Sequence, residues 1–202
     1  MQYSIEKIKI NKFSYIKELD TLRAIAVLGV IIYHYSDGYF KGGWLGVDVF
    51  FVLSGFLISN TIISSLTNKN FKFNIFYKRR IRRILPSLMS TIIFTIPLSF
   101  QLLAPKELIE YLRNTTSSLF FVSNFYLLNL DFYNTPSAKL MPMVHTWSLS
   151  IEEQFYIVFP LLIFVIYKKE KINKFLTILI FFIFSFVMAA SISSEVAFYL
   201  PQ

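Results

Sequence analysis

The 202-residue sequence contains no cysteine. This absence excludes disulfide bridges, zinc sites with thiolate ligands and an acyl-enzyme intermediate on a cysteine. Charged residues are also scarce, at 16%, whereas 55% of the residues are hydrophobic and 18% are aromatic. Because that apolar share exceeds the share in ordinary soluble domains, the composition predicts an integral membrane protein.

Two further absences bear on how the chain is organised. The first apolar run follows a charged leader and has no small-residue cleavage site behind it, which favours a retained membrane span over a signal peptide. No internal repeat or low-complexity linker divides the sequence. We therefore predict one domain, or part of one, over residues 1–202, with its motifs gathered in about 17–167.

The basic residues are few and unevenly placed. Of the 20 Lys and Arg, five precede or open the first apolar run, seven lie in residues 69–83, four lie in residues 168–174 and four lie elsewhere. This alternation is the positive-inside pattern, and it predicts a cytoplasmic N-terminus. The net charge of +8 also suits a nucleic-acid partner, but membrane topology explains it more simply, so we predict no nucleic-acid binding.

Five stretches have the roughly 20 mostly apolar residues that a membrane-spanning helix needs. They are residues 22–40, 44–66, 84–103, 146–167 and 175–192. Pro86 is expected in the first turn of the third helix, where its missing N–H costs little. The predicted fold class is therefore all-α, a polytopic membrane bundle of about five transmembrane helices.

Residues 105–145 join the third and fourth stretches on the predicted outer side. The piece 117–130 is apolar enough to enter the membrane, but a full crossing would place the lysine-rich turn 168–174 outside. We therefore predict a re-entrant or interfacial helix there. The sequence stops directly after an apolar run without a basic flank, which suggests a truncated product.

An arginine and a histidine bracket the first apolar run. Arg23 and His34 are eleven residues apart, which on a helix is a rise of about 16 Å and an azimuth that differs by about 20°. Ionisable residues in membrane helices usually face a bundle interior or a wet cavity. The pair is therefore a candidate catalytic site, and a snorkelling arginine with a capped interfacial histidine is the alternative.

Asp48 lies one turn inside the predicted outer end of the second stretch. An ionised carboxylate there needs a partner, and His34 and Lys41 are the nearest candidates along the chain. An interfacial aspartate that helps the helix to start is the alternative. Gly46 and Gly55 are interpreted as helix-packing positions.

A basic cluster that includes Arg79, Arg80 and Arg83 precedes the third stretch. Arg80 and Arg83 are three residues apart at a helical start, so they point to one side and suit bidentate contacts with a phosphorylated ligand. Binding of lipid head groups, together with topology, is the alternative explanation. No pattern in the sequence points to a metal site.

The segment HTWSLSIEEQFY leads into the fourth stretch. If it is helical, His145 and Glu152 share a face, and Glu152 and Tyr156 lie one turn apart. A role near the helix N-terminus explains one of the adjacent Glu152 and Glu153. The other glutamate has no such explanation, which favours a functional role for it.

Taken in order, these elements resemble the membrane acyltransferase-3 family. The matching segments are ELDTLRAIA at 18–26, GWLGVDVFFVLSGFLI at 43–58, FYKRRIRRILP at 76–86 and HTWSLSIEEQFY at 145–156. Asp20 and Trp147 belong to the first and last of these motifs, and Thr21 stands where the family usually has glycine. Each motif is weak alone, whereas four in this order are specific.

The resemblance implies a multi-pass enzyme of the bacterial cytoplasmic membrane that O-acylates a surface glycan such as lipopolysaccharide, capsule or peptidoglycan. It implies that Arg23 and His34 are needed for acyl transfer and that Arg80 and Arg83 act on the cytoplasmic side. It also implies that the chain is the N-terminal half of the family domain. The expected partners are membrane lipids, the acyl donor and the glycan acceptor.

The donor implied is a cytoplasmic acyl-CoA, with acetyl-CoA as the family default, and no bound cofactor is expected. Its phosphates would meet Arg80 and Arg83, with Arg79 beside them, and Arg23 would hold a phosphate or orient the donor.

His34 would take the proton from an acceptor hydroxyl. Glu152 or Glu153 would orient His34 or the acceptor, and Asp48 is a further catalytic candidate. Two other functions remain open, a transporter or flippase fragment whose buried ions line a solute path, and an inactive truncated acyltransferase.

Overall fold

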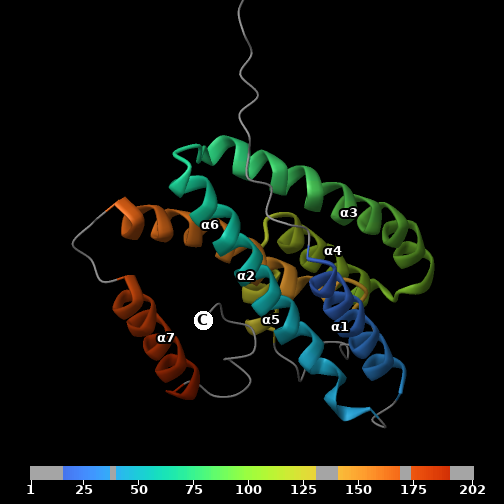
Figure 1. Cartoon of the computed structure of the whole chain (residues 1–202). Helices are drawn as coiled ribbons and strands as arrows, with labels where there is room; N and C mark the ends of the chain where they lie inside the picture. Colours follow the sequence, from blue (N-terminus) through green and yellow to red (C-terminus); the bar gives the residue numbers. More distant parts are fainter. Residues whose placement is uncertain (1–15, 37–39, 131–140, 169–173, 192–202) are drawn as a thin grey trace, which may run out of the picture. The chain divides into compact units, whose positions relative to one another are not determined.

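The computed structural model describes residues 16–36, 40–130, 141–168 and 174–191. Every regular element in these ranges is helical, which confirms the predicted all-α class (Figure 1). The elements are α1 (Lys17–Tyr35), the 3₁₀ helix η1 (Lys41–Trp44), α2 (Leu45–Thr67), α3 (Phe73–Leu102), α4 (Pro105–Leu119), α5 (Ser123–Leu128), α6 (Thr146–Lys168) and α7 (Lys174–Ser191). Most of the predicted turn 168–174 and the C-terminal residues lie outside the described ranges.

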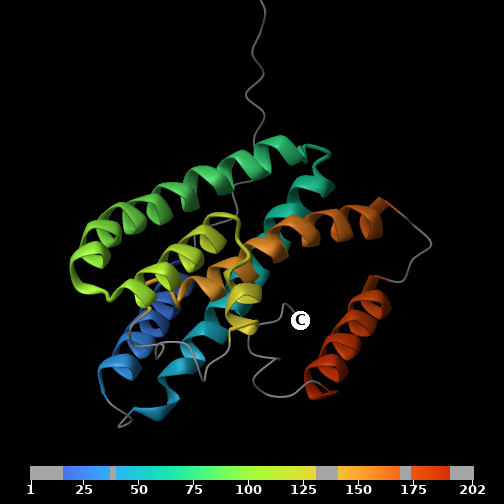
Figure 2. The same cartoon turned by 180° about the vertical axis from the view of Figure 1, so that it is seen from behind.

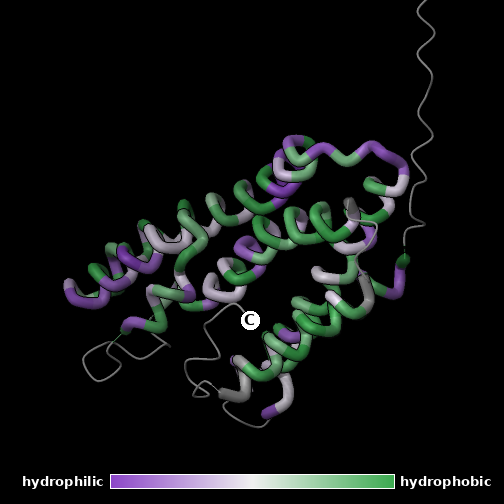
Figure 3. The backbone as a smooth tube through the Cα atoms, turned by 90° about the vertical axis from the view of Figure 1, so that its left-hand side faces the viewer, coloured by the Kyte–Doolittle hydropathy of each residue, from purple (hydrophilic) through white to green (hydrophobic). Residues whose placement is uncertain are grey.

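Three helical segments are long and apolar enough to cross a membrane. They are Lys41–Thr67, Phe73–Leu102 and Thr146–Tyr167, and Leu176–Val187 is a shorter apolar helix. Figure 3 shows long hydrophobic stretches along the helices, with hydrophilic residues at several of the turns between them. The prediction of a polytopic helical membrane protein therefore has support from three of its five predicted spans.

The helices form two compact units that divide within α2, Met1–Leu57 and Ile58–Gln202. In the first unit, α1 packs closely against η1, and Gly46 at the start of α2 lies against Ala26 of α1. A Cβ atom added to Gly46 would lie 2.4 Å from the Ala26 carbonyl oxygen, so Gly46 is a packing position, as predicted. A Cβ atom added to Gly55 would meet nothing within 4 Å, so the same prediction for Gly55 finds no support.

In the second unit, α3 is a 30-residue helix, about 45 Å long. It begins at Phe73 and includes the basic cluster, so Pro86 lies well inside the helix. The prediction that Pro86 occupies the first turn is wrong, because Lys and Arg are good helix formers and the helix continues through them beyond the apolar stretch.

The end of α2, the start of α3 and the end of α6 meet in the second unit. The hydroxyls of Thr67 and Tyr167 are 2.8 Å apart, and the Tyr77 hydroxyl donates to the Ile157 carbonyl at 3.0 Å. Beneath these contacts lies a hydrophobic cluster whose buried members are Ile58, Ile62, Phe76, Tyr156 and Ile163. The start of α3 at Phe73 therefore lies beside the end of α6 at Phe164, whereas Arg80 further along α3 lies beside Tyr156 in the middle of α6.

Helices α4 and α5 pack beside α6, as Figure 2 shows from behind. The prediction of a single helix over 117–130 is wrong, because α4 ends at Leu119 and α5 starts at Ser123. The Val122 N–H bonds the Ser117 carbonyl, the Phe121 N–H bonds the Ser118 carbonyl, and Phe121 has a φ of 54°. This is the Schellman arrangement, which ends a helix by satisfying its last carbonyls.

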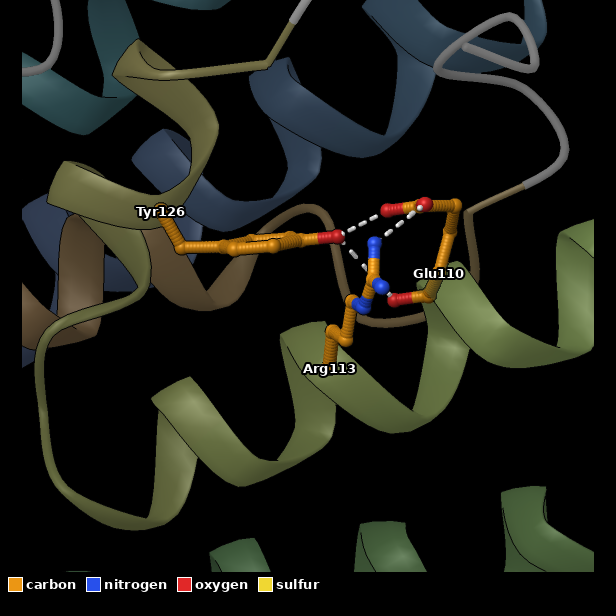
Figure 4. A network of polar contacts seen from close by, with 3 residues as sticks. All are labelled: Glu110, Arg113 and Tyr126. Atoms are coloured by element: carbon orange, nitrogen blue, oxygen red, sulfur yellow. Dashed lines mark hydrogen bonds and ion pairs between the residues drawn. The ribbon is translucent and has the colours of Figure 1, made fainter.

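A polar network ties α5 to α4 across this break (Figure 4). The Tyr126 hydroxyl donates to the Glu110 carboxylate, and Arg113 Nη1 lies 3.1 Å from the same carboxylate. Burial and the Glu110 carboxylate raise the pKa of the Tyr126 hydroxyl above its ordinary value, because both disfavour the phenolate. Tyr126 therefore stays a hydrogen-bond donor at every physiological pH.

Replacing Tyr126 with phenylalanine should lower the free energy of unfolding by about 1.5–3 kcal/mol, the usual range for a hydrogen bond to a charged group. Because the pKa of Tyr126 is raised, the hydrogen bond stabilises the protein fully at a pH below the ordinary tyrosine pKa of 10.0. Its contribution to the free energy of unfolding declines as the pH rises above that value. Denaturant unfolding in detergent at neutral and alkaline pH measures both effects. Tyr35→Phe, at a ring that is 87% exposed, is the matched control and should change little.

Candidate functional site

The candidate residues identified from the sequence lie in both units. The first unit holds Asp20, Arg23, His34 and Asp48. The second holds Arg79, Arg80, Arg83, His145, Trp147, Glu152 and Glu153. Within the described ranges, no three His, Asp or Glu side chains gather as a metal ion would require.

Arg23 lies in the second turn of α1, where its guanidinium is 3.5 Å from the Asp20 carboxylate. Both residues belong to the first motif. His34 lies in the last turn of α1, about 16 Å further along the same face. The two candidate catalytic residues therefore share a helix face, as predicted, but do not touch.

The backbone of α1 orients the His34 ring. Its Nδ1 lies 2.8 Å from the Val30 carbonyl oxygen, one turn back, and the Tyr33 ring meets it edge-on with centroids 5.1 Å apart. A carbonyl oxygen only accepts, so Nδ1 carries the proton in the neutral ring and Nε2 carries the lone pair.

Asp48 is exposed in the first turn of α2. A carboxylate at that position interacts favourably with the partial positive charge of the helix N-terminus. The structure therefore agrees with a helix-starting role for Asp48.

Arg80 is held between two aromatic rings in the second unit. Its guanidinium carbon lies 4.6 Å from the centroid of the Tyr156 ring and 5.8 Å from that of Phe76. The Tyr156 hydroxyl bonds the Glu152 carboxylate one helical turn earlier, which confirms the predicted register of these two residues. Stacking covers the face of the guanidinium and leaves its N–H groups at the edge, whereas Arg79 is exposed.

Glu153 is only 9% exposed, and its Oε1 has no hydrogen-bond partner among the described residues. Arg80, Arg83 and Glu152 are the charged groups that act on it. Because α6 begins at Thr146, both glutamates lie beyond its first turn, so the helix-start explanation for one of them is wrong. A buried carboxylate that interacts electrostatically with two arginines is typical of functional sites.

His145 lies in the turn before α6, and Trp147 lies half-buried in its first turn. The expectation that His145 and Glu152 share a face required His145 to be helical, and the helix starts one residue after it.

A polar cluster that the sequence did not predict lies where α6 meets α4 and α5. Thr146 Oγ1 lies 2.6 Å from Ser118 Oγ and 3.2 Å from Ser123 Oγ, and the hydroxyls of Ser123 and Ser150 are 2.8 Å apart. One turn beyond Ser150, Gln154 pairs with Asn124 and donates to the Phe121 carbonyl at 2.8 Å. The serine, threonine and asparagine run at 114–124 was the available signal.

A groove of about 240 Å³ runs between α3 and α6 within the second unit. Its lining residues are Arg83, Ile84, Ser87, Leu88, Thr91, Thr146 and Leu149. The α3 members recur at helical spacing, so they form one face from Arg83 to Thr91, about 12 Å long. The groove therefore joins the basic end of α3 to the polar cluster around Thr146.

Nearly the whole chain matches a known protein-family model. Residues 16–201 match the acyltransferase domain model of the acyltransferase-3 type. No solved structure matches the chain.

Two relatives of this chain are named as O-acetyltransferases. The O-acetyltransferase OatA of Staphylococcus aureus is 41% identical over 155 residues, which cover 74% of this chain and 25% of that protein. A putative O-acetyltransferase of S. aureus strain COL is 39% identical over 170 residues, which cover 82% of this chain and 28% of that protein. The chain thus spans about a quarter of the length of these relatives.

Proposed function

This chain belongs to the acyltransferase-3 family, and from that premise we propose that it moves an acetyl group from cytoplasmic acetyl-CoA to a hydroxyl of a cell-surface carbohydrate. The observation that carries the proposal is the basic end of α3, where Arg80 stacks on the Tyr156 ring of α6 and Arg83 lines a groove. Guanidinium groups bind phosphates bidentately, and an acyl-CoA carries several phosphates. In this proposal Arg79 adds positive charge at the same end.

His34 is the proposed general base. Its Nε2 takes the proton of the acceptor hydroxyl, the hydroxyl oxygen attacks the thioester carbonyl, and the carbon–sulfur bond breaks. The protonated imidazole then returns the proton to the leaving thiolate. Arg23 is proposed to orient the donor, while Asp20 holds its guanidinium at 3.5 Å.

The proposed topology has five crossings with a cytoplasmic N-terminus in the bacterial inner membrane. Its support is the contact between Thr67 and Tyr167, because it brings together helix ends that both carry basic flanks. The same topology puts Arg80 and Arg83 on the side where acyl-CoA is made.

Removing the ring of Tyr156 should weaken donor binding. Tyr156→Leu takes away the surface on which Arg80 stacks, so we expect the KM for acetyl-CoA to rise about fivefold to tenfold. Tyr156→Phe retains the ring and should raise the KM for acetyl-CoA less. Steady-state kinetics test this, with Phe155→Leu as the matched control, because the Phe155 ring stacks on Phe159 instead. An equal rise in KM in Phe155→Leu would contradict the role of Tyr156.

The direct test of the function uses membranes that carry the full 202-residue chain, supplied with radiolabelled acetyl-CoA. Label should appear in the endogenous surface glycan and should be absent from membranes without the chain. A solute flux that is independent of acetyl-CoA, without transfer of label, would instead support a transporter.

A further inference from the structure

The groove between α3 and α6 has a chemical order along its length. The cationic Arg83 lies at one end, and the hydroxyl-bearing Thr91 and Thr146 lie at the other. Between them are the apolar side chains of Ile84, Leu88 and Leu149. A ligand that matches this order has an anion at one end and a mostly apolar chain with a few polar groups behind it.

The hydroxyl of Thr91 has a defined role in this lining. It donates to the Ser87 carbonyl at 3.0 Å within α3, so its oxygen presents a lone pair to the groove. The Thr146 hydroxyl is instead engaged by the protein itself, since it lies 2.7 Å from the Met143 carbonyl, 2.6 Å from Ser118 Oγ and 3.2 Å from Ser123 Oγ, so Thr146 closes that end of the groove. A fixed acceptor such as the Thr91 hydroxyl suits the N–H group of a secondary amide.

We propose that this groove receives the flexible arm of the acyl donor, the chain of methylenes and secondary amides that carries the thioester. Arg83 holds a donor phosphate at the mouth, and the thioester end points along α3 toward Thr91 and Thr146. The inference rests on the proposed function and deepens it. It also separates the two arginines, because Arg83 lines the groove whereas Arg80 is stacked on Tyr156.

The absence of native cysteine makes a direct test possible, because one introduced cysteine is the only thiol in the chain. Ser87→Cys places it in the groove with little change in volume. Saturating acetyl-CoA should slow its alkylation by a water-soluble maleimide at least about fivefold, because thiol reactivity requires access. Asn74→Cys, at an exposed position in the first turn of α3, is the control and should react at the same rate with and without acetyl-CoA.

The nucleotide half of coenzyme A, which lacks the arm, separates the arm from the phosphates. It should compete with acetyl-CoA for binding yet leave the alkylation of Ser87→Cys unchanged. Equal protection by the nucleotide half, or no protection by acetyl-CoA, would overturn the proposed groove site.

A pair of bulky substitutions gives an independent measurement. Ser87→Leu should weaken equilibrium binding of acetyl-CoA about tenfold by filling the groove, whereas Ser90→Leu, three residues along α3 and outside the lining, should not. Equal weakening in both variants would overturn the inference. If the wild-type chain and Ser87→Leu bind acetyl-CoA equally well, the groove site is wrong but the proposed function stands. If the wild-type chain neither binds acetyl-CoA nor transfers acetyl groups, the proposed function itself is wrong.

Discussion

Replacing His34 with alanine should lower the turnover rate of acetyl transfer by about 10²–10⁴-fold, the usual contribution of a positioned general base. The reason lies in the geometry of the ring. Its Nδ1 proton is held by the Val30 carbonyl at 2.8 Å, which fixes the tautomer and leaves the lone pair on Nε2. Alanine keeps the helix and removes the base.

The measurement is initial-rate kinetics with radiolabelled acetyl-CoA, and the KM for the donor should change by no more than about twofold, because His34 acts on the acceptor proton. Tyr35→Ala is the matched control, since it removes a larger ring from the next position, where the side chain is 87% exposed. Full transfer by His34→Ala would exclude the base role. Equal loss in Tyr35→Ala would show that the end of α1 tolerates no truncation.

The parts of the site that the sequence predicts are those that lie within one helix. Glu152 and Tyr156 are four residues apart, so helical periodicity alone predicts the contact that the structure contains. The face shared by Arg23 and His34 follows in the same way. The stacking of Arg80 on Tyr156 joins α3 to α6, so it depends on packing that no local pattern specifies.

Helix boundaries were predicted less well, because an apolar run marks the hydrocarbon boundary and a helix can continue past it. The basic cluster of α3 continues the helix outward and places Pro86 in its interior. The break between α4 and α5 has no glycine to signal it, and Phe121 takes the left-handed conformation instead. Gln154 supports that break by bonding the Phe121 carbonyl, a contact across 33 residues of sequence.

Adding a single methyl group at Gly43 should disrupt the first unit. A Cβ atom there would lie 2.2 Å from the Gly29 carbonyl oxygen and 2.7 Å from the Tyr33 Cβ. The first of these atoms is backbone and cannot rotate away, so α1 and η1 must separate. We expect Gly43→Ala to lower the free energy of unfolding by about 1–3 kcal/mol or more, as overpacking of a close contact does.

The neighbouring Gly42 provides a matched control, because a Cβ atom there would meet nothing within 4 Å. Gly42→Ala should therefore stay within about 0.5 kcal/mol of the wild type in thermal or denaturant unfolding in detergent. The Gly43 contact also bears on catalysis, because Tyr33 precedes His34 and a shift of its backbone moves the proposed base. Gly43→Ala should thus lose acetyl transfer together with stability, and retention of both would show that α1 and η1 do not pack as closely as their backbone contact indicates.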